Sequence, residues 1–281
     1  MPEKMKPREF EFTDSDFNYI RNLVSDNTGI VLSDGKRDMV YSRLTRRIRE
    51  LKLSNYKSYC DRLKTGDEKE LIALTNAITT NLTSFFREPH HFDFLKTTLL
   101  ANLKKNKTSR KLRIWSAGCS SGEEPYSIAM VVHEVFESVL THWDIKILAT
   151  DLDSDMVRKA ELGIYAADRV TGIEQSRLNK FVKNGSGENQ GSVKISPRIQ
   201  SLISFKGLNL MQHWPLKGMF DIIFCRNVVI YFDKPTQKVL FDRYADLMVE
   251  NGHLFIGHSE SLHMVTDRFR LLGKTIYMKE Y

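Results

Sequence analysis

The chain has 281 residues, of which 41% are hydrophobic, so it can bury one large core or two smaller ones. Three scattered cysteines (Cys60, Cys119 and Cys225) argue against a disulfide framework and against a zinc site. The absence of an apolar leader and of any run of about 18 apolar residues predicts a cytoplasmic protein without membrane insertion, and the net charge of +7 indicates an acidic partner.

Residues 10–100 are predicted to be all-helical. Polar residues around Thr13 can cap a helix whose apolar positions recur at helical spacing, and Thr28-Gly29 ends it. Three further helices are expected from their apolar periodicity. They cover Asp34–Leu51, Tyr56–Leu63 and Glu68–Thr79.

One early segment, which covers most of the second predicted helix and all of the third, holds nearly the whole charge imbalance. Between Lys36 and Lys64 there are ten basic residues and only three acidic ones. Helical spacing places Arg43, Arg46 and Arg47 on a face apart from the buried one, with Arg49 nearby. From the residues alone, a solvated charged face and a surface for an acidic partner remain equally open.

From Lys111 onward, short apolar strands alternate with amphipathic helices, which is typical of a parallel α/β sheet. The polar, basic stretch 104–110 is predicted to be a linker. A glycine-rich hairpin near Gly185 to Gly191 interrupts the alternation as a small antiparallel insertion. The predicted strands are Leu112–Trp115, Ile145–Ala149, Leu202–Lys206, Phe220–Phe224 and Gly252–Gly257.

The turn after the first strand, Ser116–Gly122, is rich in small residues and leads into a helix beginning at Glu123-Glu124. A strand, a tight turn and a helix N-terminus bring backbone close to a nucleotide-like ligand. The turn lacks a lysine, and its two acids would repel a phosphate. A nucleoside ligand with a positive charge, such as S-adenosylmethionine, suits it better.

Polar residues also end two later strands. Asp151 is positioned to accept hydrogen bonds from ribose hydroxyls, whereas Asp153 is expected to cap the following helix. The buried strand before Arg226 includes Cys225, which we interpret as a structural thiol. The His90-His91 pair could suggest a metal, but no other ligand cluster accompanies it in the sequence, so no metal is expected.

These segments together resemble the CheR family of chemotaxis receptor methyltransferases. The matching segments are Lys36–Leu44, Thr79–Glu88, Ser121–Ser127, Ala149–Asp151, Phe224–Phe232 and Gly257–Glu260. The resemblance implies a helical domain at 1–80, a linker and cofactor-contacting segment at 81–110, and a Rossmann-like S-adenosylmethionine-dependent methyltransferase domain at 111–281. A β-subdomain is implied at about 165–200.

The resemblance also implies methyl transfer to glutamate γ-carboxylates on the cytoplasmic helices of chemoreceptors, with S-adenosylhomocysteine as product. Arg87 and Tyr231 match the positions nearest the transferred methyl. The positions that match cofactor contacts are Asn81, Thr83, Arg87, Glu124, Asp151, Asn209, Leu210, Arg226 and Asn227.

The same resemblance assigns receptor recognition to the basic helix, through Arg43, Arg46, Arg47 and Arg49. It also matches Gly185, Gly187, Gly191 and Lys194 to a hairpin that docks a receptor's C-terminal pentapeptide by strand addition. Where peptide-binding relatives carry arginine, this chain has Asn184 and Lys194.

The sequence is less compatible with two other function classes. A nucleic-acid methyltransferase would suit the basic charge, but the prolyl turn typical of amine-methylating enzymes is replaced by Cys225-Arg226-Asn227, so no nucleic-acid partner is expected. A non-enzymatic cofactor sensor should have lost the residues named above, and all are present. Nothing in the sequence demands more than a monomer.

Overall fold

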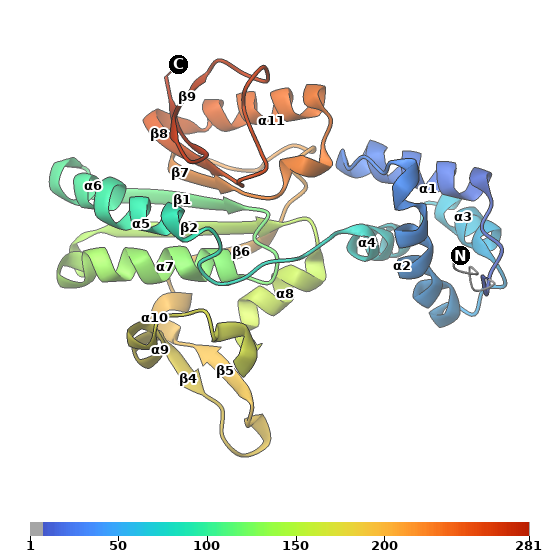
Figure 1. Ribbon diagram of the computed structural model, residues 1–281, viewed down its shortest axis with the longest axis horizontal. Helices are drawn as coiled ribbons and strands as arrows, with labels where there is room; N and C mark the ends of the chain where they lie inside the picture. Colours follow the sequence, from blue (N-terminus) through green and yellow to red (C-terminus); the bar gives the residue numbers. More distant parts are fainter. Residues whose placement is uncertain (1–7, 281) are drawn as a thin grey trace, which may run out of the picture. The chain divides into compact units, whose positions relative to one another are not determined.

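The computed structural model describes residues 8–280, and the chain divides into two compact units, Met1–Thr80 and Asn81–Tyr281. Figure 1 shows helices alone in the first unit and a twisted sheet with helices in the second. Among residues 8–280, no helix is both long and apolar enough to cross a bilayer.

Residues 8–80 of the first unit form four α-helices and one 3₁₀ turn, α1(Asp14–Thr28), η1(Asp34–Lys36), α2(Arg37–Glu50), α3(Tyr56–Lys64) and α4(Glu68–Ile78). Thr13 and Asp16 form a capping box at the start of α1, and Gly29 ends that helix in the left-handed conformation with φ of 74°. The helix expected from Asp34 to Leu51 therefore begins with a 3₁₀ turn. Residues 79–88, within the range expected to be helical, are irregular.

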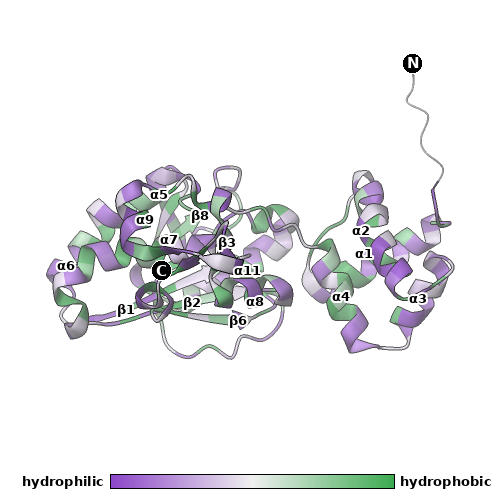
Figure 2. Cartoon of the chain, turned by 90° about the horizontal axis from the view of Figure 1, so that it is seen from below, coloured by the Kyte–Doolittle hydropathy of each residue, from purple (hydrophilic) through white to green (hydrophobic). Residues whose placement is uncertain are grey.

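One hydrophobic core holds the first unit together. α1 packs against α3 and α2 against α4, so each helix turns one apolar face inward. Figure 2 shows this as helices that are part green and part purple. The fully buried side chains of this core include Ile20, Val40, Leu44, Ile48, Tyr56, Tyr59 and Leu74.

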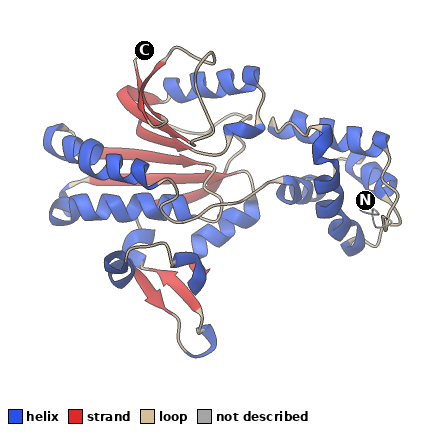
Figure 3. Ribbon diagram, in the orientation of Figure 1, coloured by secondary structure: helices blue, strands red, loops and turns tan. Residues whose placement is uncertain are grey.

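The second unit is organised by a seven-stranded sheet in the order β6-β2-β1-β7-β8-β10-β9 (red arrows in Figure 3). The first five strands of that order are parallel, while β10 runs antiparallel to both its neighbours. The strands are β1(Lys111–Ala117), β2(Asp144–Asp151), β6(Ile203–Gly207), β7(Phe220–Cys225), β8(Met248–Ile256), β9(Phe269–Gly273) and β10(Ile276–Lys279). All five strands expected from the sequence are present.

Alternate residues of the central strands point to opposite faces of the sheet, and a separate hydrophobic core lies on each face. Leu112 and Ile114 of β1 belong to one core, and Trp115 and Ala117 belong to the other. One face is covered by helices that include α5(Pro89–Phe94), the π-helical segment η2(Leu95–Leu100) and α7(Glu123–Phe136). The other face is covered by α11(Lys234–Asp246). This three-layer arrangement is the Rossmann-like fold expected from the strand–helix alternation.

A second, three-stranded antiparallel sheet lies between α8(Ser154–Leu162) and β6 in the chain. Its order is β3-β5-β4, so β5 is the central strand (Figure 1). The strands are β3(Ile164–Ala166), β4(Val182–Asn184) and β5(Ser192–Ile195), with α9(Gln175–Phe181) and α10(Pro197–Gln200) beside them in sequence. This sheet is the antiparallel insertion that the glycine-rich hairpin predicts.

The stretch 104–110 is not a linker between the two compact units, which differs from the sequence-based expectation. Its first half completes α6(Ala101–Asn106), and its second half turns into β1. The boundary between the units instead falls at Thr80 and Asn81. Basic, polar composition suits the exposed end of a helix as well as a linker, which explains the difference.

Candidate active site

The carboxyl ends of the five parallel strands meet at one edge of the sheet, and the polar residues singled out in the second unit follow these ends. Strand order reverses between β1 and β7, because the chain passes from β1 to β2 and β6 on one side and later to β7 and β8 on the other. Such a switch point is where open α/β sheets bind ligands. The topology therefore places the candidate site beside the ends of β1 and β7 (Figure 1).

The turn after β1 depends on a glycine. Gly118 has φ of 92°, and a Cβ atom placed on it would lie 2.3 Å from Cγ2 of Val228, so a side chain cannot fit. The backbone N–H groups of Gly118 and Cys119 both donate to the carbonyl of Thr150, at 2.8 and 2.9 Å. These bonds hold the turn against the end of β2.

Asp151, the last residue of β2, is held by two backbone donors. Ser120 N–H donates to its Oδ2 at 2.7 Å, and Asp153 N–H donates to its Oδ1 at 2.9 Å. Burial raises the pKa of Asp151 to about 6, against the opposing effect of these hydrogen bonds. Because a carboxylate can accept about four hydrogen bonds, Asp151 retains capacity for two ligand hydroxyls.

Asp153 caps α8, as the sequence predicts, and it also anchors the segment that precedes the sheet. Its side chain accepts hydrogen bonds from the backbone of Asp155 and Met156, and Asn81 Nδ2 donates to its Oδ2 at 2.7 Å. The carbonyl of Asn81 accepts from Ser120 Oγ at 3.1 Å. The structure thus brings Asn81 to the turn after β1, although the two are far apart in the sequence.

Arg226, which follows β7, is the most constrained charge at this edge, with 2% of its side chain exposed. It lies between two carboxylates, 3.2 Å from Glu88 Oε2 and 3.1 Å from Glu124 Oε2, and it donates to the backbone carbonyl of Arg87. Ser116 Oγ donates to the other oxygen of Glu124 at 2.7 Å. Burial raises the pKa of Glu124, and the charge of Arg226 opposes that rise.

Glu88 joins a second strand end to the same network. Its Oε1 accepts from His258 Nδ1 at 2.7 Å and from His258 N–H at 3.1 Å. Burial alone would raise the pKa of Glu88, but the hydrogen bonds from His258 and the charge of Arg226 outweigh it and lower the pKa to about 2. Glu88 therefore ties the loop before α5, the end of β7 and the end of β8 together as an anion.

Arg87 lies in the middle of this arrangement and is half-buried. Its Nη1 donates to the carbonyl of Leu82 at 2.9 Å, and both neighbours, Phe86 and Glu88, have positive φ of 52° and 58°. Left-handed backbone at non-glycine residues is a cost that the surrounding contacts must offset. Here those contacts fix the loop from which the Arg87 guanidinium projects.

The loop after β7 is fixed by a carboxylate that sequence reasoning did not single out. Glu260 is buried and accepts from the N–H groups of Asn227, Val229 and Gly257, at 2.9, 2.9 and 2.5 Å. Burial raises the pKa of Glu260, and these hydrogen bonds oppose the rise. They hold Asn227, with φ of 59°, and the short helix η6(Val229–Tyr231) that ends at Tyr231. The sequence signal for Glu260 was its position at the end of Gly257–Glu260, one of the segments that resemble the CheR family.

The remaining predicted contacts lie at the same edge with fewer constraints. The N–H of Leu208 donates to the carbonyl of Asp151 at 2.9 Å, which places Asn209 and the buried Leu210 directly beyond the ends of β2 and β6. The carbonyl of Thr83 accepts from Arg169 at 2.9 Å. Cys225 is fully buried, accepts from Tyr244 Oη at 3.3 Å and has a raised pKa because of burial, as expected of a structural thiol.

The structure brings the Glu88 carboxylate close to the His90-His91 pair. Ligand atoms of Glu88, His90 and His91 lie within 4.8 Å of one another. The Glu88 carboxylate is already shared by Arg226 and His258, and burial lowers the pKa of His91 to about 4. An ion here would have to displace a buried guanidinium, so the donor set fits a cation poorly.

Within the first unit, the four arginines predicted to bind a receptor do not behave alike. Arg43 donates to the carbonyls of Ile78 and Thr79, at 2.6 and 2.8 Å, and so caps the end of α4. Arg47 forms a bidentate pair with Glu70, which is 1% exposed. Arg46 is 84% exposed and pairs with Glu50 on its own helix, and Arg49 pairs with Glu9 on the surface.

The predicted hairpin is present between β4 and β5. A Cβ atom on Gly185 would lie 2.1 Å from the carbonyl oxygen of Asn189, so this position requires glycine. Gly187 and Gly191 have positive φ of 59° and 84°. Lys194 is exposed on the central strand β5, opposite Lys183 of the edge strand β4.

Comparisons with known proteins identify the family of this chain. Residues 81–278 match the CheR methyltransferase SAM-binding domain, and residues 15–79 match the CheR methyltransferase all-alpha domain. A chemotaxis protein methyltransferase of Escherichia coli K12 is 40% identical over 267 residues, covering 94% of this chain and 91% of the relative. Chemotaxis protein methyltransferase 2 of Pseudomonas aeruginosa PAO1 is 39% identical over 272 residues, covering 96% and 95%. This chain belongs to the CheR methyltransferase family.

Proposed function

We propose that this protein methylates the γ-carboxylates of glutamates on the cytoplasmic helices of chemoreceptors, using S-adenosylmethionine. The observation that supports this most is the convergence of the glycine turn, Asp151 and the Arg226–Asn227 loop at the switch point of a CheR-family sheet. The relatives named above are chemotaxis protein methyltransferases, which supports a chemoreceptor as the substrate.

The cofactor would lie along the carboxyl edge. Asp151 would accept the ribose hydroxyls with the lone pairs that its two backbone donors leave, and Asn209 with Leu210 would flank the adenine. Glu124, at the start of α7, suits the positive end of the ligand. The other proposed contacts come from the segment before β1 and from the loop after β7. They are Asn81, Thr83, Arg87, Arg226 and Asn227.

Bound S-adenosylmethionine supplies an activated methyl group on a sulfonium. A substrate glutamate has an ordinary pKa of about 4.3 and is already an anion at neutral pH, so no general base is required. The protein must align the carboxylate and exclude water. Arg87 would orient the incoming carboxylate through charge-assisted hydrogen bonds, and Tyr231 would line the path of the methyl group.

Receptor selection would lie in the first unit, which we propose as the recognition domain at 1–80. Of the four arginines that the sequence assigns to receptor recognition, Arg46 has a side chain that is 84% exposed. Its pair with Glu50 is a surface contact that an acidic helix could replace. Arg49 is also accessible, whereas Arg43 and Arg47 would act mainly by shaping α2 and α4. We propose Arg46 and Arg49 as the contacts that attract the receptor.

A receptor C-terminal pentapeptide would add as a strand to the small sheet. Because β5 is central, an added strand must pair with an edge, and β4 is the edge next to the glycine hairpin. Lys183 and Lys194, which lie opposite each other, would meet the peptide's carboxylate. Calorimetric titration of the peptide tests this idea, and the absence of heat at millimolar peptide would contradict it.

The decisive experiment on function is transfer of labelled methyl from S-adenosylmethionine to a purified receptor cytoplasmic fragment. Arg87→Ala is expected to lower turnover at least a hundredfold while S-adenosylhomocysteine still binds, though more weakly because one proposed contact is lost. Arg198→Ala, at an exposed arginine on α10, is the matched control. An RNA substrate is expected to take up no label. Turnover near that of the natural protein in Arg87→Ala would remove Arg87 from the reaction, and label in RNA alone would overturn the proposed substrate.

A further inference from the structure

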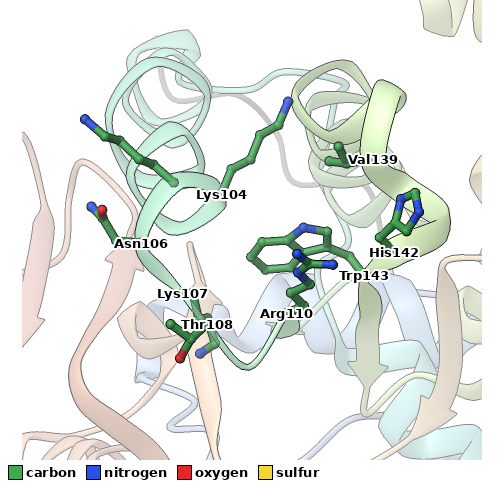
Figure 4. A pocket seen from close by; sticks show the side chains of 9 residues that line it. Lys104, Asn106, Lys107, Thr108, Arg110, Val139, His142 and Trp143 are labelled. Atoms are coloured by element: carbon green, nitrogen blue, oxygen red, sulfur yellow. The ribbon is translucent and has the colours of Figure 1, made fainter.

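A hollow of about 600 Å³ lies in the second unit, between the turn that follows α6 and the 3₁₀ helix η3(Glu137–His142) (Figure 4). Its volume falls in the range of pockets that hold small ligands. Cationic and aromatic side chains dominate its walls. The lining residues are Lys104, Lys105, Asn106, Lys107, Thr108, Arg110, Val139, His142 and Trp143.

This pocket is separate from the candidate active site. Its walls lead directly into Lys111 and Asp144, the first residues of β1 and β2, so it lies at the amino ends of these strands. The residues of the proposed methyl-transfer site follow the carboxyl ends of the same strands. A ligand here would therefore contact none of the residues assigned to the cofactor.

The pocket has positive charge that the protein does not neutralise. Residues 104–113 include no acid. Lys104 donates to the carbonyl of Val135 at 2.7 Å and Lys107 pairs with Asp221, but the side chains of Lys105 and Arg110 have no hydrogen-bond or ion-pair partner within residues 8–280. These two cations remain available to an anion.

A hydrogen bond and a ring contact hold the walls of the pocket. Asp144 N–H donates to the carbonyl of Arg110 at 2.9 Å, which joins the two walls. Arg110 has φ of 51°, a left-handed conformation that this contact must stabilise. Trp143 packs edge-on against Phe136 with ring centroids 4.7 Å apart, which holds its indole in place.

The combination of groups selects one kind of ligand. In Figure 4, the indole of Trp143 and the guanidinium of Arg110 project into the same hollow, with Val139 above them. An indole offers a stacking surface for a flat ring, and guanidinium and ammonium groups bind phosphate oxygens. We propose that this pocket binds a nucleoside phosphate, with the base against Trp143 and the phosphates at Arg110 and Lys105.

The test measures the tryptophan fluorescence of the protein during titration with ADP, GDP and UDP, since Trp143 is the one of its three tryptophans that lines the pocket. Saturating S-adenosylhomocysteine is present throughout, so that the candidate active site cannot take the nucleoside. We expect at least one of the three to bind, with pyrophosphate binding at least tenfold more weakly because it lacks a ring. Arg110→Gln is expected to weaken nucleotide binding about tenfold, and Arg198→Gln, the same change at an exposed arginine on α10, less than twofold.

Because Trp143 is both ligand contact and reporter, Trp143→Leu is tested by calorimetry and is expected to abolish the preference for nucleotide over pyrophosphate. Methylation without nucleotide is expected to be unchanged in Arg110→Gln. Failure of all three nucleotides to bind at 1 mM would overturn the proposal. Equal affinity for pyrophosphate would overturn it as well, since the pocket would then bind anions without recognising a base.

Discussion

The arginine after β7 and the arginines of α2 differ in how deeply the side chain is buried and in how it is paired. Arg226 is buried between two carboxylates of its own unit, and 2% of its side chain is exposed. Arg46 is 84% exposed and meets only a neighbour on its own helix. A buried charge that is paired with carboxylates positions the loops around it, whereas an exposed one remains available to a partner. Arg47, paired with the buried Glu70, stands between these extremes.

The largest expected effect comes from removing the buried cation. Arg226→Met would leave the buried Glu124 without its cation and Glu88 with His258 as its remaining partner, so we expect the second unit to lose about 3–5 kcal/mol of unfolding free energy. Binding of S-adenosylhomocysteine is expected to be lost as well. Urea unfolding and calorimetry measure both. Arg226→Lys, which keeps the charge, is expected to lose less, and equal losses in the two variants would mean that geometry rather than charge matters.

Arg47→Ala tests the intermediate case. It would leave the buried Glu70 with Arg62, whose Nε lies 4.0 Å from its Oε2, as the remaining cation, and since 30% of the Arg47 side chain is exposed, water can relieve part of the cost. We expect a loss of about 2–3 kcal/mol in the unfolding free energy of the first unit. Arg49→Ala on the same helix removes only a surface pair and is the control. If both variants unfold alike, the Arg47–Glu70 pair does not stabilise this unit.

Asp151 extends the comparison to a buried anion without a cationic partner. With a pKa of about 6, it gains a proton as the pH falls from 7 to 5, where about one tenth remains ionised. We expect affinity for S-adenosylhomocysteine to fall by up to about tenfold over this range, measured by calorimetry. Asp151→Asn is expected to bind more weakly and with no such pH dependence.

Acid unfolding would not explain that loss of affinity. Because the pKa of Asp151 is raised on folding, the folded state binds more protons than the unfolded state between pH of about 4 and 6. The contribution of this group to stability therefore increases as the pH falls, opposite to its effect on ligand affinity. A melting temperature that falls in step with affinity would contradict the assignment.

The smallest effect is expected at the exposed charge. Arg46→Glu should leave the unfolding transition nearly unchanged and slow association with a receptor fragment a few-fold at low salt, with the difference vanishing at high salt. Stopped-flow association at two ionic strengths measures this. Arg158→Glu on α8, an exposed arginine with a helical acidic neighbour, is the matched control. An equal change in both variants would reflect net charge rather than a receptor surface.

Local pattern in the sequence predicted much of this molecule. Apolar periodicity and caps gave the four N-terminal helices, and strand–helix alternation gave the parallel strands of the sheet. The small-residue turn before Glu123, the acid at the end of β2 and the helix cap at Asp153 are likewise short-range features, because each depends on residues a few positions apart. The sequence therefore determined the fold class and the edge at which a nucleoside would bind.

Only the tertiary structure decided which charges are paired. Arg226 and Glu124 are 102 residues apart, and Arg47 and Glu70 are 23 apart, so no local period reports these contacts. For the same reason the sequence did not identify Glu260, which holds the loop that ends at Tyr231. It also could not show that residues 104–110, expected to be a linker, line a pocket. The reason is physical: helix and strand formation depends on neighbouring residues, whereas the partner of a charge depends on which segments the packed core brings together.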